Sequence, residues 1–157
     1  GNAYPAILSN WFDFDYINLG FSGNAKGEQE MAEYIANLEM GIFVLDYDHN
    51  APDLQHLQNT HYAFYQTVRA AHPHIPILMM TSITKPWTQD HYFERRDTIY
   101  NSYMKAKENG DENVYFWDGS KEFAPYDNYG TVEGTHPNDF GFYGMAASLR
   151  QLLKEII

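Results

Sequence analysis

An α/β fold with a parallel sheet is predicted, because apolar strand-like runs alternate with helix-like segments along the chain. Residues 42–47 and 75–81 are almost continuously apolar, as expected of strands covered on both faces. Around them lie segments such as 28–38, with apolar residues at three- and four-residue steps. Strands alternating with helices form parallel sheets with right-handed crossovers. At 157 residues the chain has the size of one domain.

The predicted elements run from a helix near the N-terminus to a helix at the C-terminus. Pro5 stands in the first turn of the first helix, where its missing N–H costs nothing. Gly41 and Gly110 follow helical segments and are typical of helix ends. The helices are expected at 3–11, 28–38, 53–72, 91–109 and 138–157, the strands at 16–20, 42–47, 75–81 and 113–117, and a long loop at 118–137.

The charge balance narrows the class of partner. With 21 acidic and 10 basic residues the net charge is -11, the opposite of what a nucleic-acid backbone binder normally carries. An anionic membrane surface is disfavoured for the same reason, and no apolar run approaches the ~20 residues that span a bilayer. Neutral or weakly charged small molecules fit best. Nothing in the sequence decides the oligomeric state, so a homo-oligomer stays open.

The chain contains no cysteine, which excludes disulfides, a cysteine nucleophile and thiolate metal sites. Residues 1–5 lack the charged and apolar regions of a signal peptide, so none is visible. The compartment is therefore left open, and it would be extracytoplasmic if a longer natural N-terminus carried such a signal.

Three short motifs carry the chemistry. Their sequences are Asn-Leu-Gly-Phe-Ser-Gly-Asn at 18–24, Asp-Tyr-Asp-His-Asn-Ala-Pro at 46–52 and Glu-Gly-Thr-His-Pro-Asn-Asp-Phe-Gly at 133–141. Together they resemble blocks two, three and five of the SGNH (GDSL-type) hydrolases, which are esterases and acylhydrolases. The resemblance covers nearly the whole chain and implies a three-layer α/β/α, flavodoxin-like fold. The first block of that family, the Gly-Asp-Ser or Gly-Ser-Ser turn that carries the nucleophile, is not in these residues.

The resemblance raises a question about the sheet. In a flavodoxin-like sheet of order 2-1-3-4-5 the first strand is central, yet this chain begins on a helix. Without that strand, 16–20 and 42–47 would lie ~10 Å apart, with rows of unpaired backbone groups between them. Residues upstream, a separate chain, or closure into a rearranged four-stranded sheet would each satisfy those groups. We favour the first, so 1–157 is expected to be one SGNH hydrolase-like domain, incomplete at its N-terminus.

His136 is the candidate catalytic base, and Glu133 is the candidate carboxylate that orients it. A carboxylate three residues before the histidine can accept its Nδ1–H and leave Nε2 free to take a proton. SGNH hydrolases usually have Asp at this upstream position, so Glu133 adds one methylene. In the alternative interpretation, His136 caps the last helix or bonds only within its loop.

Gly23 and Asn50 are the candidate oxyanion donors that the resemblance implies, through a backbone N–H and a side-chain amide. Taken alone, Gly23 fits a flexible turn equally well, while a phosphate loop lacks its Gly-Lys-Ser/Thr ending. The usual Gly-x-Asn-Asp of block three reads Asp48-His49-Asn50-Ala51 here. Asn50 has an alternative role as a cap for the helix that begins near Asp53.

Ser22 is not expected to be the nucleophile, because it lacks a Gly-x-Ser-x-Gly elbow and because the matching family serine only precedes the oxyanion glycine. The resemblance puts the attacking serine upstream of Gly1. Ser22 is instead a candidate for the substrate pocket. The remaining pocket candidates are aromatic residues that serve packing equally well: Trp87, Tyr126 and Tyr129. The histidines lack metal-ligand spacing, so neither a metal nor a cofactor is expected.

The function that follows is ester hydrolysis through an acyl-serine intermediate. The resemblance implies short-chain acyl esters as substrates, including acylated carbohydrates. The main alternative is a non-catalytic, SGNH-derived binding protein that has lost the nucleophile. A flavodoxin-like nucleotide binder is a weaker alternative, because a proper phosphate loop is missing.

Overall fold

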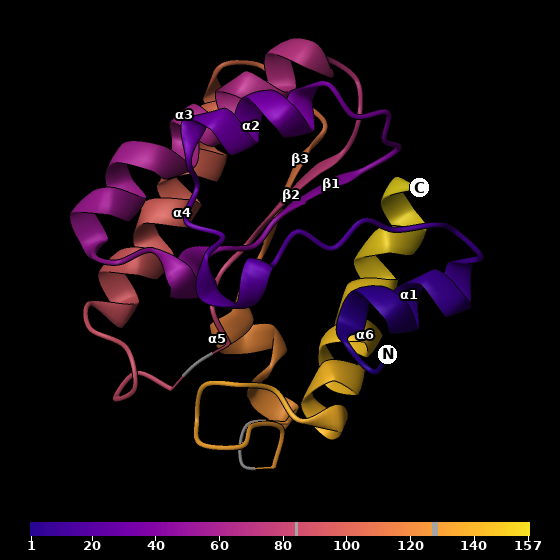
Figure 1. The fold of residues 1–157 in the computed structure, drawn as a ribbon, viewed down its shortest axis with the longest axis vertical. Helices are drawn as coiled ribbons and strands as arrows, with labels where there is room; N and C mark the ends of the chain where they lie inside the picture. Colours follow the sequence, from indigo (N-terminus) through magenta and orange to yellow (C-terminus); the bar gives the residue numbers. More distant parts are fainter. Residues whose placement is uncertain (84, 127–128) are drawn as a thin grey trace.

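A small parallel sheet lies at the centre of the computed structural model, which describes residues 1–83, 85–126 and 129–157 (Figure 1). Its strands are β1 (Phe43–Leu45), β2 (Ile77–Met80) and β3 (Val114–Trp117), in the order β1-β2-β3. Both pairings are parallel. The α/β architecture with a parallel sheet is therefore confirmed.

Five helices match the predicted ones to within two residues at either end. They are α1 (Tyr4–Phe12), α2 (Gln29–Ala36), α3 (Leu54–Ala71), α4 (Tyr92–Glu108) and α6 (Asp139–Ile156). Four shorter elements were not predicted: η1 (Phe21–Gly23), η2 (Asp48–Asn50), α5 (Gly119–Glu122) and η3 (Ala124–Tyr126). Among the described residues, every helix is too short or too polar to cross a membrane.

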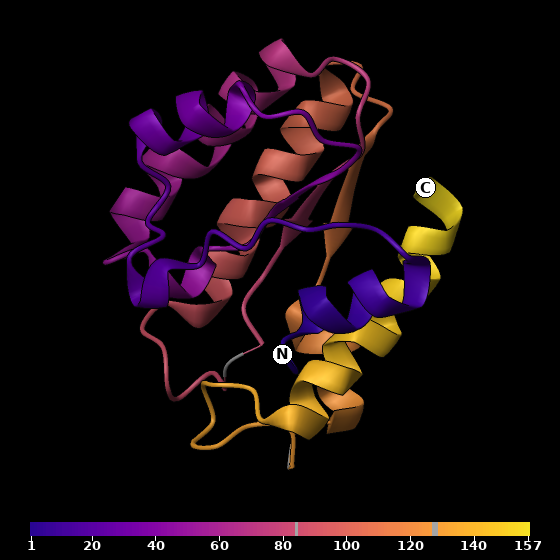
Figure 2. The same ribbon diagram turned by 45° about the vertical axis from the view of Figure 1, so that its right-hand side comes forward.

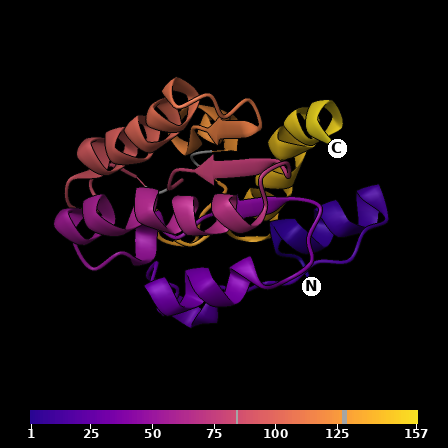
Figure 3. The ribbon, with the colours of Figure 1, turned by 90° about the horizontal axis from the view of Figure 1, so that it is seen from above.

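The sheet is covered on both faces, which gives the three layers that were expected. Side chains alternate along β2, so Ile77 and Met79 pack with α2, α3 and α4, whereas Leu78 and Met80 pack with α1 and α6. All four residues of β2 are buried. Figure 3, seen from above, shows the two sets of helices on either side of the strands, with α1 beside α6.

The predicted strand at 16–20 is wrong. Residues 14–20 have no regular secondary structure, and Ile17 is 67% exposed. In Figure 2 this stretch runs from the end of α1 across the sheet to η1. Within the described chain, no backbone hydrogen bond joins it to β1. A strand forms only where a neighbour satisfies its backbone groups, and within the described residues β1 pairs with β2 alone.

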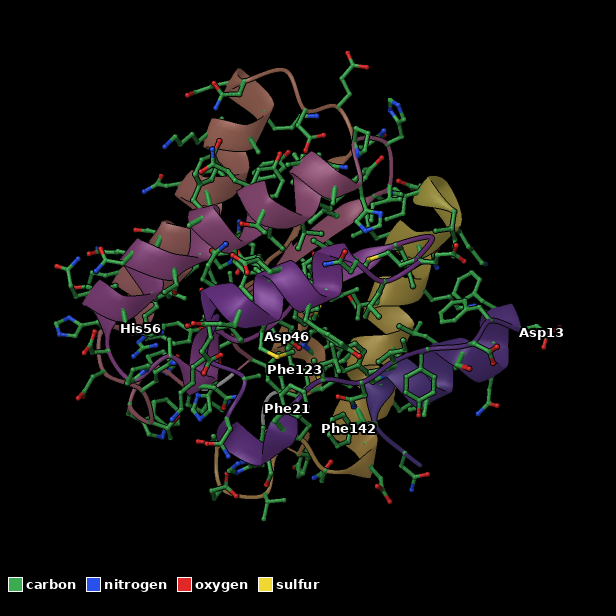
Figure 4. All side chains as sticks on the ribbon, turned by 45° about the horizontal axis from the view of Figure 1, so that its top comes forward. Asp13, Phe21, Asp46, His56, Phe123 and Phe142 are labelled. Atoms are coloured by element: carbon green, nitrogen blue, oxygen red, sulfur yellow. The ribbon has the colours of Figure 1, made fainter. Side chains whose placement is uncertain are left out.

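Asp46 is the first residue after β1, the edge strand of the sheet, and it lies between α2 and α6 in Figure 4. Tyr4 of α1 donates a hydrogen bond from its hydroxyl to Asp46 Oδ2 at 3.0 Å. Desolvation by the surrounding protein atoms is the main effect that raises the pKa of Asp46 to about 6, although part of the residue is exposed to solvent. The sheet thus did not close up into four strands, and a solvent-accessible carboxyl stands beside its free edge.

The loops that follow the strands gather at one end of the molecule, the lower end in Figure 1. They are η2 after β1, the loop after β2 and α5 after β3, and both η1 and the stretch 129–138 that leads into α6 lie toward the same end. Ligand sites of open parallel sheets lie at the carboxyl ends of the strands, so this is the end to search.

Candidate functional site

Glu133 and His136 form a hydrogen-bonded pair in the loop before α6. The His136 ring nitrogen Nδ1 lies 2.6 Å from Glu133 Oε1, and the His136 backbone N–H donates to the same oxygen at 2.8 Å. These two N–H groups, the backbone one first, hold the pKa of Glu133 below its usual value. The extra methylene of Glu therefore does not prevent the carboxylate from reaching the ring. Because Nδ1 is engaged, Nε2 is the nitrogen left for proton transfer.

The loop that carries this pair has a defined backbone. The Val132 N–H donates to the His136 carbonyl at 2.9 Å, and the Lys85 N–H, from the loop after β2, donates to the Gly134 carbonyl at 3.0 Å. Gly134 has φ 88°, a conformation that L side chains rarely adopt, so glycine is required between Glu133 and His136. The side chain that caps α6 is Asn138, which accepts from the Gly141 N–H. His136 is therefore not a helix cap.

The second motif lies next to the first. It forms the turn η2 directly after β1, and the rings of His49 and His136 meet edge to face with centroids 6.3 Å apart. Asn50 follows His49, and its side-chain amide makes no hydrogen bond to any other described residue. The N-cap of α3 is Asp53, which accepts from the His56 N–H at 2.7 Å. The capping role considered for Asn50 is therefore wrong, and Asn50 is the residue next to His49, whose ring meets that of His136.

His49 itself was not among the predicted site residues. Partial burial lowers its pKa, and the neighbouring His136 and Arg95 act in the same direction, whereas Glu133 opposes them. A neutral His49 ring adds no positive charge beside His136.

Gly23 lies in η1, a turn with an unusual backbone. Phe21, Ser22 and Gly23 all have positive φ, of 49°, 50° and 86°. A Cβ added at Gly23 would meet no atom within 4 Å, so the conformation and not a lack of space explains the glycine, and the space before it is open. The structure describes no contact from Gly23 or Ser22 to the histidine pair. Their roles stay predictions.

The serine hydroxyls of the described chain are largely engaged elsewhere. Two donate to backbone carbonyls, Ser9 to that of Phe14 and Ser102 to that of Thr98. Two donate to carboxylates, Ser120 to Asp118 and Ser148 to Glu122. No serine among residues 1–83, 85–126 and 129–157 is seen to bond His136. Within these segments, no serine is therefore hydrogen-bonded to the pair.

The three aromatic pocket candidates have different surroundings. Trp87 is 78% exposed, with the Lys85 ammonium 5.6 Å from its ring, and it borders a cavity of about 220 Å³ that Tyr92, Phe93 and Ser120 also line. Tyr126 packs between Phe123 and Phe140. Tyr129 is 79% exposed, and its carbonyl accepts from Asn138. Trp87 is thus the candidate that borders a hollow, and Tyr126 has the contacts of a packing residue.

Metal ligation finds no support in the donor set. Across the described segments no three His, Asp or Glu side chains converge as a metal ion would need. At the site already described, the carboxylate of Glu133 is hydrogen-bonded to His136.

A family model described as the GDSL-like lipase/acylhydrolase family matches residues 1–154. The chain belongs to this family. The model covers nearly the whole chain, so the resemblance drawn from the three motifs is confirmed. No protein of curated function matches the chain.

Several solved structures share the fold of this chain. A GDSL-like lipase from Bacteroides ovatus superposes with a TM-score of 0.88 at 32% identity, over 99% of this chain and 48% of its own length. The salicylyl-acyltransferase SsfX3 of a tetracycline biosynthetic pathway gives 0.83 at 20% identity, over 97% of this chain and 48% of its own. A family two carbohydrate esterase from Clostridium thermocellum, in complex with cellohexaose, gives 0.70 at 17% identity, over 98% and 54%. The chain thus spans about half the length of these proteins.

Two charged residues behind the second motif were missed by sequence reasoning. Asp48 and Arg95 are both buried, and one guanidinium nitrogen lies 3.7 Å from Asp48 Oδ1. Burial raises the pKa of Asp48, while the Ser82 N–H and Arg95 oppose that effect. A signal existed for Asp48, which stands where the family motif usually has Gly. Nothing in the helical pattern of 91–109 marked Arg95 as buried.

Proposed function

We propose that this chain supplies the base, the orienting carboxylate and the oxyanion turn of an ester hydrolase, and that the nucleophilic serine comes from outside these 157 residues. One observation carries the proposal: the Glu133–His136 pair, bonded at 2.6 Å, adjoins through His49 the turn that contains Asn50, whose amide bonds no other described residue. Base, carboxylate and oxyanion donor are the groups that acyl transfer requires in addition to a nucleophile.

In the proposed reaction, His136 Nε2 takes the proton from the serine hydroxyl as its oxygen bonds to the ester carbonyl carbon. Asn50 and the Gly23 N–H donate to the oxyanion that forms. His136 then returns the proton to the departing alcohol oxygen, which leaves an acyl-serine. In the second half, water loses a proton to His136 as its oxygen attacks the acyl carbon. His136 then returns this proton to the serine oxygen as the acyl–serine bond breaks and the acid leaves.

The free edge of β1 supports an external origin for the serine. A parallel strand beside β1 would pair its unpaired backbone groups and end at the same edge of the sheet as His49 and Asn50. Such a strand would also shield the pair, in which the side chain of His136 is now 75% exposed. A separate chain or residues upstream of Gly1 would serve equally, and we favour the latter.

Acylated carbohydrates are the proposed substrate class. Exposed Trp87 beside a cavity of about 220 Å³ offers an aromatic face of the kind that stacks on sugar rings. The net charge of -11 fits a neutral substrate. A carbohydrate esterase is among the proteins with the same fold.

The test is hydrolysis by a gene product extended upstream of Gly1, assayed on p-nitrophenyl acetate and on an acetylated xylo-oligosaccharide. Turnover that needs both the upstream serine and His136 is expected. A folded extended protein that hydrolyses neither ester would favour the second candidate, the non-catalytic binding protein. That candidate rests on the absence of a serine from the described histidine site, and it predicts carbohydrate binding without turnover.

A further inference from the structure

The turn that carries Asn50 is held from behind by one buried side chain. Arg95 of α4 donates from one terminal nitrogen to the Asp48 carbonyl at 2.9 Å and from the other to the Ala51 carbonyl at 3.0 Å. These carbonyls flank His49 and Asn50 on either side. The planar fork of the guanidinium therefore fixes both ends of a four-residue turn at once.

A charge contact adds to this hold. The guanidinium lies 3.7 Å from Asp48 Oδ1, and Asp48 Oδ2 accepts from the Ser82 N–H at 2.9 Å. Ser82 follows β2, so the turn after β1 is tied to the next strand of the sheet as well as to α4. Both charged side chains are at least 94% buried, which shields the contact from water.

Arg95 is in turn oriented by its own helix. Its Nε donates to the Asp90 carbonyl at 3.1 Å, just before α4 begins. All three nitrogens of the guanidinium are thus occupied by backbone carbonyls of two segments, 48–51 and the α4 entry. These hydrogen bonds fix the position of the Arg95 side chain, and through it they fix the position of the 48–51 turn.

We infer that Arg95 is a positioning residue for catalysis, which acts by holding Asn50 where its amide meets the oxyanion. This inference rests on the proposed function. Oxyanion donors act only when they are fixed before the reaction, because a mobile amide must be reoriented at the moment when charge develops. Lysine at position 95 keeps the charge but offers one nitrogen, so it reaches one carbonyl of the turn and releases the other.

The neighbouring Arg96 provides a matched control. It lies on the same helix and pairs with Asp118 at 2.6 Å, away from the 48–51 turn. Arg96→Lys therefore makes the same chemical change one residue along. Far-ultraviolet circular dichroism would verify that each variant is folded.

The first measurement uses the 157-residue chain and no substrate. Amide hydrogen exchange and the side-chain NH₂ signals of Asn50 are followed by NMR in the unsubstituted chain, Arg95→Lys and Arg96→Lys. We expect exchange at 49–51 to accelerate about tenfold or more in Arg95→Lys alone, with shifted Asn50 signals. Unchanged exchange and unchanged Asn50 signals in folded Arg95→Lys would overturn the inference, whatever the activity of the protein.

The second measurement uses the extended protein and a double-mutant cycle. Arg95→Lys is expected to lower kcat about tenfold with KM within twofold, and to cause no further loss when Asn50 is already Ala. Arg96→Lys should leave kcat unchanged. An equal tenfold loss in the Asn50→Ala background would show that Arg95 does not act through Asn50. An unsubstituted extended protein without turnover would instead refute the proposed function, and the exchange data would stand apart from that result.

Discussion

The two motifs that meet at His136 are built in opposite ways. The 48–51 turn is anchored from below by a buried Asp48–Arg95 pair, whereas the 133–136 loop presents a pair whose side chains are 52% and 75% exposed. A buried pair is costly to break and an exposed pair contributes little to stability. We therefore expect substitutions behind the turn to change stability as well as activity, and substitutions in the loop to change activity alone. Substitutions in the two regions should therefore separate stability from activity.

The largest expected effect is on activity at the exposed loop. In the extended protein, the proposed mechanism predicts that His136→Ala reduces kcat by about 10⁴-fold, because His136 is its proposed proton acceptor. The midpoint of urea unfolding should not change, since the ring is exposed and bonds only Glu133. A parallel loss of stability would break the comparison, because it would make the loop part of the core.

A large loss of stability is expected at the buried turn. Arg95→Met leaves Asp48 buried without its cation, so the free energy of unfolding should fall by about 3–5 kcal/mol in urea titrations. Arg96→Met, in which the lost side chain is 24% exposed, should cost less than half as much. Equal losses from the two arginines would show that burial of the turn is not what distinguishes the regions.

A third substitution sharpens the role of the loop. Glu133→Gln keeps the size of the side chain but loses the carboxylate that fixes the His136 tautomer, so kcat should fall about 100-fold. Glu133→Asp, the residue usual in the family, should retain most of the activity. Neither substitution should change the midpoint of urea unfolding. An unaffected kcat in Glu133→Gln would remove Glu133 from the proposed site.

The smallest expected effect is the change in stability with pH that buried His61 causes near the turn. His61 of α3 stacks on Tyr47, just before the turn, and burial lowers its pKa to about 3. Because its pKa is near 6.5 in the unfolded chain, its contribution to stability is present above pH 6.5 and is lost as the pH falls toward 3. Between pH 7 and pH 5 the loss should be about 2 kcal/mol. His61→Phe should lack this step; an identical pH profile in the variant would assign the step to other groups.

Much of the fold could be predicted because its signals are local. The apolar period of 28–38 and the continuous run at 75–81 follow from one helix face and one doubly covered strand. The 16–20 segment failed because a strand needs a partner, and pairing is not a property of the segment itself. At the site, the hydrogen bond between Glu133 and His136 could be predicted because the two residues are only three positions apart. The contribution of Arg95 depends on a contact across 47 positions in the sequence, which no local pattern reveals.

The central claim is that His136 is a working base whose serine partner lies outside this chain. The most direct test treats the 157-residue chain and the extended protein with a fluorophosphonate and reads intact and peptide masses, with His136→Ala as the control. The account predicts no adduct on the short chain and one phosphonyl group on a serine upstream of Gly1, lost in His136→Ala. A His136-dependent adduct on Ser22, or an extended and folded protein that takes no label, would contradict it.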